Sequence, residues 1–260
     1  MTESAPTPTP SHNLLADKIV VVTAAAGTGI GFSAALRAAE EGATVVISDR
    51  HERRLGEAAE KIKAETGQEP LAVPCDVTVQ EQIDALMDKA VEAHGRIDVL
   101  INNAGLGGTA SVIDMTDEQW DSVLNISLTS VFKATRSVLR HMVPAKRGVI
   151  INNASVIGWR AQAGQAHYAA AKAGVMALTR CSAIDVAEHG IRVNAVAPSI
   201  AMHAFLAKVT SDELLDKLSE QEAFGRPAEP WEVANVMMFL ASDYSSYMTG
   251  EVVSVSSQRA

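Results

Sequence analysis

Apolar runs rich in valine and isoleucine alternate along the chain with longer amphipathic segments. Continuous apolar runs indicate strands covered on both faces, because a strand exposed on one face shows apolar and polar positions in alternation. The runs predict seven strands, at residues 18–23, 43–48, 71–74, 97–103, 148–155, 191–198 and 251–256. The amphipathic segments predict helices at residues 30–41, 51–65, 79–94, 117–142, 166–188 and 230–242.

The regular alternation of strands and helices favours an α/β fold. We expect a single-domain, Rossmann-like doubly wound sheet of about seven parallel strands with helices on both faces. No linker rich in proline or glycine divides the chain, so residues 14–260 are predicted to form one domain, with a substrate lid at about 199–226. Residues 1–13, MTESAPTPTPSHN, are predicted to be a disordered tail, because alternating threonine and proline cannot form a packed core.

Composition and charge narrow the classes of partner. Hydrophobic residues make up 47% of the chain, and 31 acidic against 22 basic residues give a formal net charge of -9. We expect no nucleic-acid partner, because the chain lacks a basic surface, and no membrane partner, because no stretch approaches ~20 apolar residues. Cys75 and Cys181 stand in no CxxC spacing, and the seven histidines show no ligand spacing. These features predict a reducing, cytoplasmic location and no metal site.

The stretch VVTAAAGTGIG, residues 21–31, leads from a predicted strand into a predicted helix. Backbone N–H groups at such a turn point toward an anion, and the helix N-terminus favours negative charge. Gly27, Gly29 and Gly31 would let a pyrophosphate approach the backbone closely. A glycine pattern alone also fits a merely flexible turn.

Asp49 ends the second predicted strand, 18 residues after Gly31. This spacing is close to the ~20 residues expected for the acid that binds a ribose 2′-OH. A carboxylate there would repel a 2′-phosphate, so NAD is the expected cofactor, while Arg50 leaves NADP open. The alternative interpretation is that Asp49 caps the following helix.

The sequences CDV (75–77) and INNAG (101–105) end the third and fourth predicted strands. Ligands of doubly wound sheets bind at the carboxyl ends of the strands, where these segments converge. The residues expected to contact the dinucleotide are Ala25, Gly27, Gly29, Ile30, Gly31, Asp49, Arg50, Asp76, Val77, Asn103, Ala104, Gly105, Tyr168, Lys172, Pro198 and Ile200.

Tyr168 and Lys172 are four residues apart in a predicted helix, so their side chains share one face. This spacing alone is common and also fits an exposed tyrosine beside a solvated lysine. Ser155 ends the fifth predicted strand at the same edge of the sheet, and Asn125 lies on the predicted helix 117–142. Together they indicate a site that handles a proton while a cofactor carries the hydride.

The glycine-rich turn, NNAG, Asn125, Ser155, Tyr168 and Lys172 together resemble the short-chain dehydrogenase/reductase family, over residues 15 to about 255. The resemblance implies that Tyr168 is the acid/base, that Ser155 polarises a carbonyl, that Lys172 contacts the nicotinamide ribose and that Asn125 completes a proton relay. A free tyrosine has a pKa of ~10. We expect the neighbouring ammonium and the positive charge of the oxidised nicotinamide together to lower the pKa of Tyr168.

The chain departs from the family pattern at two places. Aligned on Gly29 and Gly31, Ala24 and Ala25 stand where a Thr-Gly pair is common; aligned on Thr23, the loop is one residue longer and Ala24 replaces the first glycine. In either alignment an alanine is harmless if its φ angle is negative. We therefore expect an altered but working loop. Ser199 replaces a common glycine after the sixth strand, and His203 falls near a threonine that contacts the nicotinamide carboxamide in relatives.

The expected activity is interconversion of a secondary alcohol and a ketone. Substrate contacts are predicted at Trp159, Arg160, His203 and Phe205. The lid resembles that of relatives acting on hydroxylated ring or CoA-linked catabolic intermediates, including steroid-derived ones. The alternatives are an NADPH-dependent 3-oxoacyl-thioester reductase and a non-catalytic NAD-sensing or scaffold protein. The family resemblance also implies a homotetramer, with the helices at 117–142 and 166–188 in its main interface.

Overall fold

Seven parallel strands form one sheet in the computed structural model, which describes residues 7–202, 215 and 218–257. Their order across the sheet is β3-β2-β1-β4-β5-β6-β7, so the chain runs outward from β1 in both directions. This confirms the predicted doubly wound sheet. The strands are β1 (Ile19–Val22), β2 (Thr44–Asp49), β3 (Leu71–Pro74), β4 (Val99–Asn102), β5 (Gly148–Asn153), β6 (Ile191–Pro198) and β7 (Val252–Val255).

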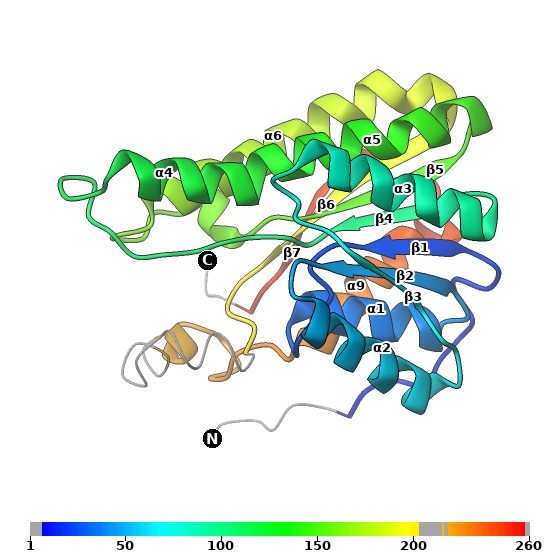
Figure 1. Cartoon of the computed structure of the whole chain (residues 1–260). Helices are drawn as coiled ribbons and strands as arrows, with labels where there is room; N and C mark the ends of the chain where they lie inside the picture. The colour runs from blue at the N-terminus through cyan, green and yellow to red at the C-terminus, as the bar shows by residue number, and fades with distance from the viewer. Residues whose placement is uncertain (1–6, 203–214, 216–217, 258–260) are drawn as a thin grey trace.

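Helices cover both faces of this sheet (Figure 1). On one face lie α1 (Ile30–Glu40), α2 (Glu52–Thr66) and α9 (Pro230–Ala241). On the other lie α3 (Gln80–His94), α5 (Ser130–Ala145) and α6 (Ala166–Val186), with α4 (Asp117–Leu124) leading into α5. None of the described helices is both long and apolar enough to cross a membrane.

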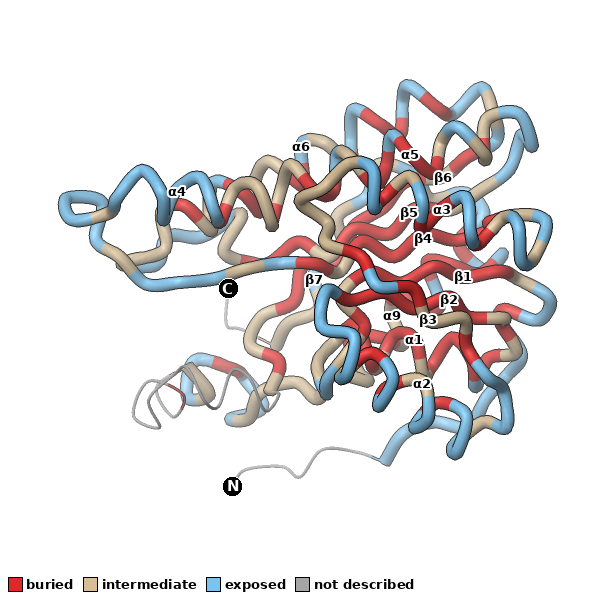
Figure 2. The backbone as a smooth tube through the Cα atoms, in the orientation of Figure 1, coloured by how far each residue is buried: buried red, intermediate tan, exposed pale blue. Residues whose placement is uncertain are grey.

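Successive side chains of each strand enter different cores. Val20 and Val22 of β1 pack in the cluster under α1 and α9, whereas Ile19 and Val21 pack in the cluster under α3, α5 and α6. The inner strands are therefore largely buried (Figure 2), whereas the edge strands β3 and β7 each contain an exposed residue. Burying one such side chain stabilises the fold by about 1.5–3 kcal/mol, which explains the continuous apolar runs.

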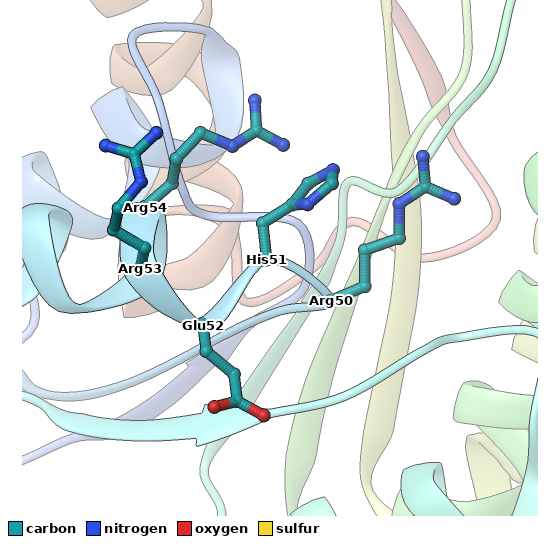
Figure 3. A pocket seen from close by; sticks show the side chains of 5 residues that line it. All are labelled: Arg50, His51, Glu52, Arg53 and Arg54. Atoms are coloured by element: carbon teal, nitrogen blue, oxygen red, sulfur yellow. The ribbon is translucent and has the colours of Figure 1, made fainter.

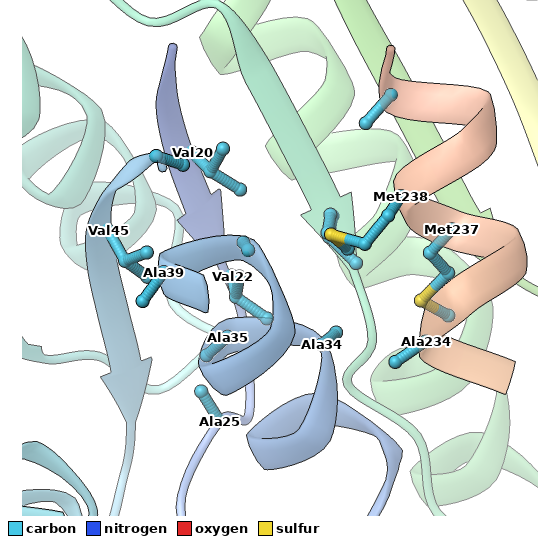
Figure 4. Packing of buried hydrophobic residues seen from close by; sticks show 14 of the residues in the cluster. Val20, Val22, Ala25, Ala34, Ala35, Ala39, Val45, Ala234, Met237 and Met238 are labelled. Atoms are coloured by element: carbon cyan, nitrogen blue, oxygen red, sulfur yellow. The ribbon is translucent and has the colours of Figure 1, made fainter. Parts of the chain in front are cut away.

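Small residues let α1 approach the sheet and α9 closely. Ala34 and Ala35 of α1 are fully buried against the valines of β1 on one side and α9 on the other (Figure 4). The two methionines Met237 and Met238 of α9 fill the remaining space. This packing fixes the start of α1 at the carboxyl end of β1.

The predicted helix 117–142 is interrupted, which corrects the sequence-based expectation. Residues Asn125–Thr129 form the π-helical segment η1 between α4 and α5, and the amide of Ser130 donates to the carbonyl of Asn125. A π-helical turn holds one residue more than an α-helical turn. The apolar positions before and after η1 keep a helical spacing, so the sequence pattern did not reveal this extra residue. Such interruptions are frequent at functional sites.

The predicted tail 1–13 also differs from the structure in its described part. The Arg37 guanidinium donates to Thr9 and to the carbonyl of Pro10, while the Glu41 carboxylate accepts from the amides of His12 and Leu14. Arg37 and Glu41 themselves form a buried ion pair at 2.7 Å. Polar anchors on α1, rather than apolar burial, hold this segment. Residues 1–6 lie outside the described residues.

Candidate active site

The glycine-rich turn lies between β1 and α1, at the carboxyl edge of the sheet. Gly27 has a φ of 97°, and no described atom lies within 4 Å of the Cβ that another residue would add there. At Gly31 an added Cβ would lie 2.3 Å from both the Ala24 carbonyl oxygen and Asn103 Nδ2. The first turn of α1, which starts after Gly29, carries no acidic residue and no side-chain cap within the described part of the chain. Its free N–H groups suit an anion.

Ala24 does not have the negative φ angle that would make an alanine harmless in this turn. Its φ is 52°, in the left-handed region, rather than negative. That conformation costs a non-glycine residue roughly 1–2 kcal/mol. Ala25, a predicted cofactor contact, is fully buried, and its amide donates to the Ser48 carbonyl at 2.9 Å. Ala25 thus attaches the glycine-rich turn to β2.

Asp49 ends β2 and is nine-tenths buried. Its Oδ1 accepts from the His51 amide at 2.9 Å, and Oδ2 makes no hydrogen bond within the described residues. His51, not Asp49, is the N-cap residue of α2. Asp49 therefore fixes the turn between β2 and α2 with one oxygen. The alternative interpretation, in which Asp49 caps the following helix, is wrong, because His51 occupies that position.

A cavity of about 310 Å³ opens beside this turn, at the start of α2. Its walls are formed by five consecutive side chains, which point in different directions from the turn (Figure 3). Three of them are arginines, which favour anions. The lining residues are Arg50, His51, Glu52, Arg53 and Arg54.

Asp76 and Val77 follow β3 at the same edge, and both are half-buried. Hydrogen bonds from the amide and hydroxyl of Thr78, at 2.9 and 2.7 Å, hold the pKa of the Asp76 carboxyl below its usual value. The positive charge of Arg50 acts in the same direction. Asp76 is therefore a carboxylate that is held in place by Thr78, and it stabilises the loop that follows β3.

Thr23 and Asn153 organise the site, although the sequence did not mark either of them as a site residue. The Thr23 hydroxyl accepts from the amides of Asn103 and Ala104, at 3.0 and 3.3 Å. Asn103 donates from Nδ2 to the Ala24 carbonyl and accepts at Oδ1 from Asn153 Nδ2, each at 3.0 Å. These bonds join β1, β4 and β5. The matching NN doublets at the ends of β4 and β5 were the available signal.

A second polar chain lies deeper, inside the sheet. Asn102 Nδ2 donates to Asn152 Oδ1 at 2.9 Å, and Asn152 Nδ2 donates to the Thr179 hydroxyl at 2.9 Å. All three residues are buried. This chain ties β4 and β5 to α6, which carries Tyr168 and Lys172.

Ser155, Tyr168 and Lys172 meet where β5, β6 and α6 converge. The Ser155 hydroxyl hydrogen-bonds to Tyr168, donates to the Pro198 carbonyl at 3.5 Å and accepts from the Ile157 amide at 3.3 Å. Lys172 Nζ lies 5.5 Å from the centre of the Tyr168 ring and donates to the Asn153 carbonyl at 2.6 Å. The predicted grouping of these three side chains is present in the structure.

The pKa of Tyr168 differs from the sequence-based expectation. Burial raises it to about 12, against a smaller lowering by the Ser155 hydrogen bond. Burial also lowers the pKa of Lys172 to about 8. The ammonium lies over the ring face and is bound to a carbonyl, so desolvation outweighs its attraction for a phenolate.

Asn125 and Ser127 occupy different environments in η1. Asn125 is half-buried, and within the described residues its side chain makes no hydrogen bond. Ser127 is fully buried, and its hydroxyl binds both the amide and the carbonyl of Leu106. Nothing in the sequence marked Ser127, because a serine in a helix has many ordinary roles.

The predicted substrate contacts are only partly described. Trp159 is 50% exposed and Arg160 is exposed, both just after Ser155. His203 and Phe205 lie outside the described residues.

Backbone hydrogen bonds join the two ends of the predicted lid. Ala228 donates to the Ile200 carbonyl and accepts from the Met202 amide, each at 2.9 Å. The amide of Ser199, next to Pro198, donates to Val255 of β7 at 3.2 Å. The described residues at the two ends of the predicted lid therefore lie at the carboxyl edge of the sheet.

Comparison with known proteins decides the family. The family profile described as enoyl-(acyl carrier protein) reductase matches residues 24–257. The chain is 64% identical over 255 residues to a (5R,7aS)-5-hydroxy-7a-methyl-1-oxo-2,3,5,6,7,7a-hexahydro-1H-indene-carboxyl-CoA reductase of Mycobacterium tuberculosis, covering 98% of this chain and 97% of that protein. A crystal structure of a short chain dehydrogenase from Mycobacterium smegmatis matches with a TM-score of 0.88 and 60% identity, over 99% of both chains. The chain belongs to the short-chain dehydrogenase/reductase family.

This short-chain dehydrogenase/reductase is accordingly an oxidoreductase of the ketone/alcohol type. It is less similar to a 3-oxoacyl-[acyl-carrier-protein] reductase of Thermotoga maritima, at 39% identity over 93% of this chain and 97% of that protein. Levodione reductase gives a TM-score of 0.89 at 32% identity, over 94% of this chain and 97% of that one.

Proposed function

We propose that this enzyme reduces a ring ketone of a CoA-linked, steroid-derived catabolic intermediate, and oxidises the corresponding alcohol in reverse. The observation that carries this proposal is the 64% identity, over nearly the whole chain, to the indene-carboxyl-CoA reductase. The thioester reductase of Thermotoga maritima shares far less of the sequence, at 39% identity, which disfavours the 3-oxoacyl alternative.

The residues present fit a dinucleotide. The open space at Gly27, the absent Cβ at Gly31 and the uncapped start of α1 suit a pyrophosphate, and Asp49 keeps one oxygen for a ribose hydroxyl. When bound, a nicotinamide dinucleotide supplies or accepts the hydride. The remaining task for the protein is to orient the carbonyl and handle one proton.

We assign that proton to Tyr168. A tyrosine with a raised pKa stays protonated across the neutral range and can donate from its hydroxyl to the carbonyl oxygen. Ser155, bonded to Tyr168, donates to the same oxygen and orients it. Lys172 stands behind the ring, where its charge favours the phenolate that remains after donation.

The test is turnover followed by the absorbance of reduced nicotinamide. Bicyclic ring-ketone CoA esters are expected to be reduced at least about tenfold more efficiently than linear 3-oxoacyl thioesters. The opposite order would support the thioester reductase. Tyr168→Phe should abolish turnover, whereas a Tyr244→Phe control alters an exposed tyrosine. Equal turnover by wild type and Tyr168→Phe would contradict the assignment, and inactivity of the wild type on both panels would favour the sensor or scaffold alternative.

We further propose NAD as the preferred cofactor, because the Asp49 carboxylate at the end of β2 would repel a 2′-phosphate. The arginines around the adjacent cavity keep NADP as the competing choice. Fluorescence titration should show tighter binding of NADH than of NADPH. Asp49→Asn should narrow that gap, and Glu52→Gln, which neutralises a nearby exposed carboxylate, should not. Tighter NADPH binding by the wild type would overturn the preference.

We also propose a cytoplasmic homotetramer. The free thiols of Cys75 and Cys181 suit a reducing compartment. Phe132 of α5 and Ile184 of α6 are 44% and 77% exposed, and such apolar side chains favour an interface on these helices. Light scattering should give four times the chain mass, and Ile184→Glu should reduce it.

A further inference from the structure

We propose that Ser127, rather than Asn125, is the residue of η1 that positions the catalytic site. Its hydroxyl holds the loop at Gly105 and Leu106 in place, and that loop lies against Lys172. Ser127 is a positioning residue in this proposal, which rests on the oxidoreductase function proposed above.

Burial separates the two candidates. Ser127 has no exposed surface and is the one buried residue of η1. Asn125, at the start of η1, engages its neighbours through its backbone, whose carbonyl accepts from Ser130. The π-helical turn thus directs Ser127, two residues further on, into the protein.

The Ser127 hydroxyl uses both of its hydrogen-bonding functions on one residue. It accepts from the Leu106 amide at 2.9 Å and donates to the Leu106 carbonyl at 3.0 Å. Leu106 is thereby fixed at both ends of its backbone. Alanine could make neither bond, and the half-buried amide and carbonyl of Leu106 would lose their partner, which destabilises this conformation of the loop.

Gly105 connects this contact to the catalytic lysine. A Cβ placed on Gly105 would lie 3.5 Å from Lys172 Nζ and 3.9 Å from Ser127 Oγ. The ammonium and the hydroxyl therefore face the same side of Gly105. If the loop moves when the Ser127 bonds are lost, the surroundings of Lys172 change with it, and a displacement of about 1 Å at a reaction centre can cost 10²-fold in rate.

The experiment compares Ser127→Ala with Asn125→Ala, using NADH and a ketone that the wild type reduces. Ser127→Ala should lower kcat by about tenfold or more while changing KM by less than about threefold. Asn125→Ala should lower kcat by clearly less than Ser127→Ala does. Ser122→Ala removes an exposed hydroxyl from α4 and serves as the matched control. Thermal unfolding and NADH binding are measured for every variant.

A kcat loss in Asn125→Ala equal to or above that in Ser127→Ala would overturn the proposal, as would an unchanged kcat in Ser127→Ala. If Ser127→Ala does not fold, Ser127→Cys makes the same comparison, since a thiol of similar size is a weaker donor and acceptor. Its kcat should then fall below that of Asn125→Ala. Inactivity of the wild type itself would instead count against the proposed function.

Discussion

The ammonium of Lys172 lies over the face of the Tyr168 ring, 5.5 Å from its centre, and not beside its hydroxyl. Both groups are removed from water, so the pKa of Tyr168 rises to about 12 and that of Lys172 falls to about 8. Burial disfavours the charged form of each group. These directions suit the proposed reduction, in which Tyr168 donates a proton to a ketone.

Lys172 should make the stability of the enzyme depend on pH. Between about pH 8 and 10.5 the unfolded chain binds a proton at this lysine that the folded chain has lost, so the free energy of unfolding rises with pH. The full contribution is about 3 kcal/mol. Lys172→Met should remove this rise in urea unfolding between pH 7.5 and 9.5. Lys89→Met, at an exposed position of α3, should keep it.

Ala24→Gly should stabilise the enzyme. Ala24 has a φ of 52°, which glycine adopts without the clash of a Cβ. We expect an increase of about 1 kcal/mol in the free energy of unfolding, measured by urea unfolding at pH 7. A decrease would mean that the alanine side chain contributes more through packing than its backbone conformation costs.

Gly31→Ala should damage the dinucleotide site. The new Cβ would lie 2.3 Å from the Ala24 carbonyl oxygen and from Asn103 Nδ2, so the turn must shift. NADH affinity should fall by at least about tenfold. Gly56→Ala adds its Cβ where no described atom lies within 4 Å, and in α2 it should preserve affinity and raise stability slightly. Equal NADH affinity in both variants would exclude Gly31 from the site.

Glu41→Ala should be strongly destabilising. Glu41 is 1% exposed and pairs with Arg37, whose buried charge would keep only the more exposed Glu40 as an ionic partner. Removing one member of a buried pair costs about 3–5 kcal/mol. Glu57→Ala breaks the exposed Arg53–Glu57 pair of α2 and should cost less than about 1 kcal/mol. Thermal unfolding of the two variants measures the difference. Similar losses of stability in Glu41→Ala and Glu57→Ala would contradict the role given to burial of the ion pair.

The sequence predicted the architecture because burial on both faces leaves a continuous apolar pattern in the inner strands. The sequence also predicted that Ser155, Tyr168 and Lys172 lie close together. Ser155 follows the fifth strand, and Tyr168 and Lys172 share one face of the following helix. The sequence did not predict η1, because one shifted hydrogen bond leaves the apolar pattern intact. The raised pKa of Tyr168 depends on what surrounds the ring, and the left-handed Ala24 depends on a turn that no neighbouring residue type dictates.

The polar contacts of residues 9–12 were not predicted, for a related reason. Their composition cannot form a core, but Arg37 and Glu41 on α1 need polar partners and find them in the backbone of this segment. Thr23 was missed because a single threonine at a strand end has no distinctive spacing. Both cases depend on contacts between residues far apart in the chain.

Ile200 and Met202 are joined to Ala228 through main-chain atoms, so these bonds do not depend on which side chains stand there. Substitution of any of these three side chains therefore leaves the hydrogen bonds available. Selection can change the side chains at this edge of the sheet while the backbone connection between the segments before and after it is kept.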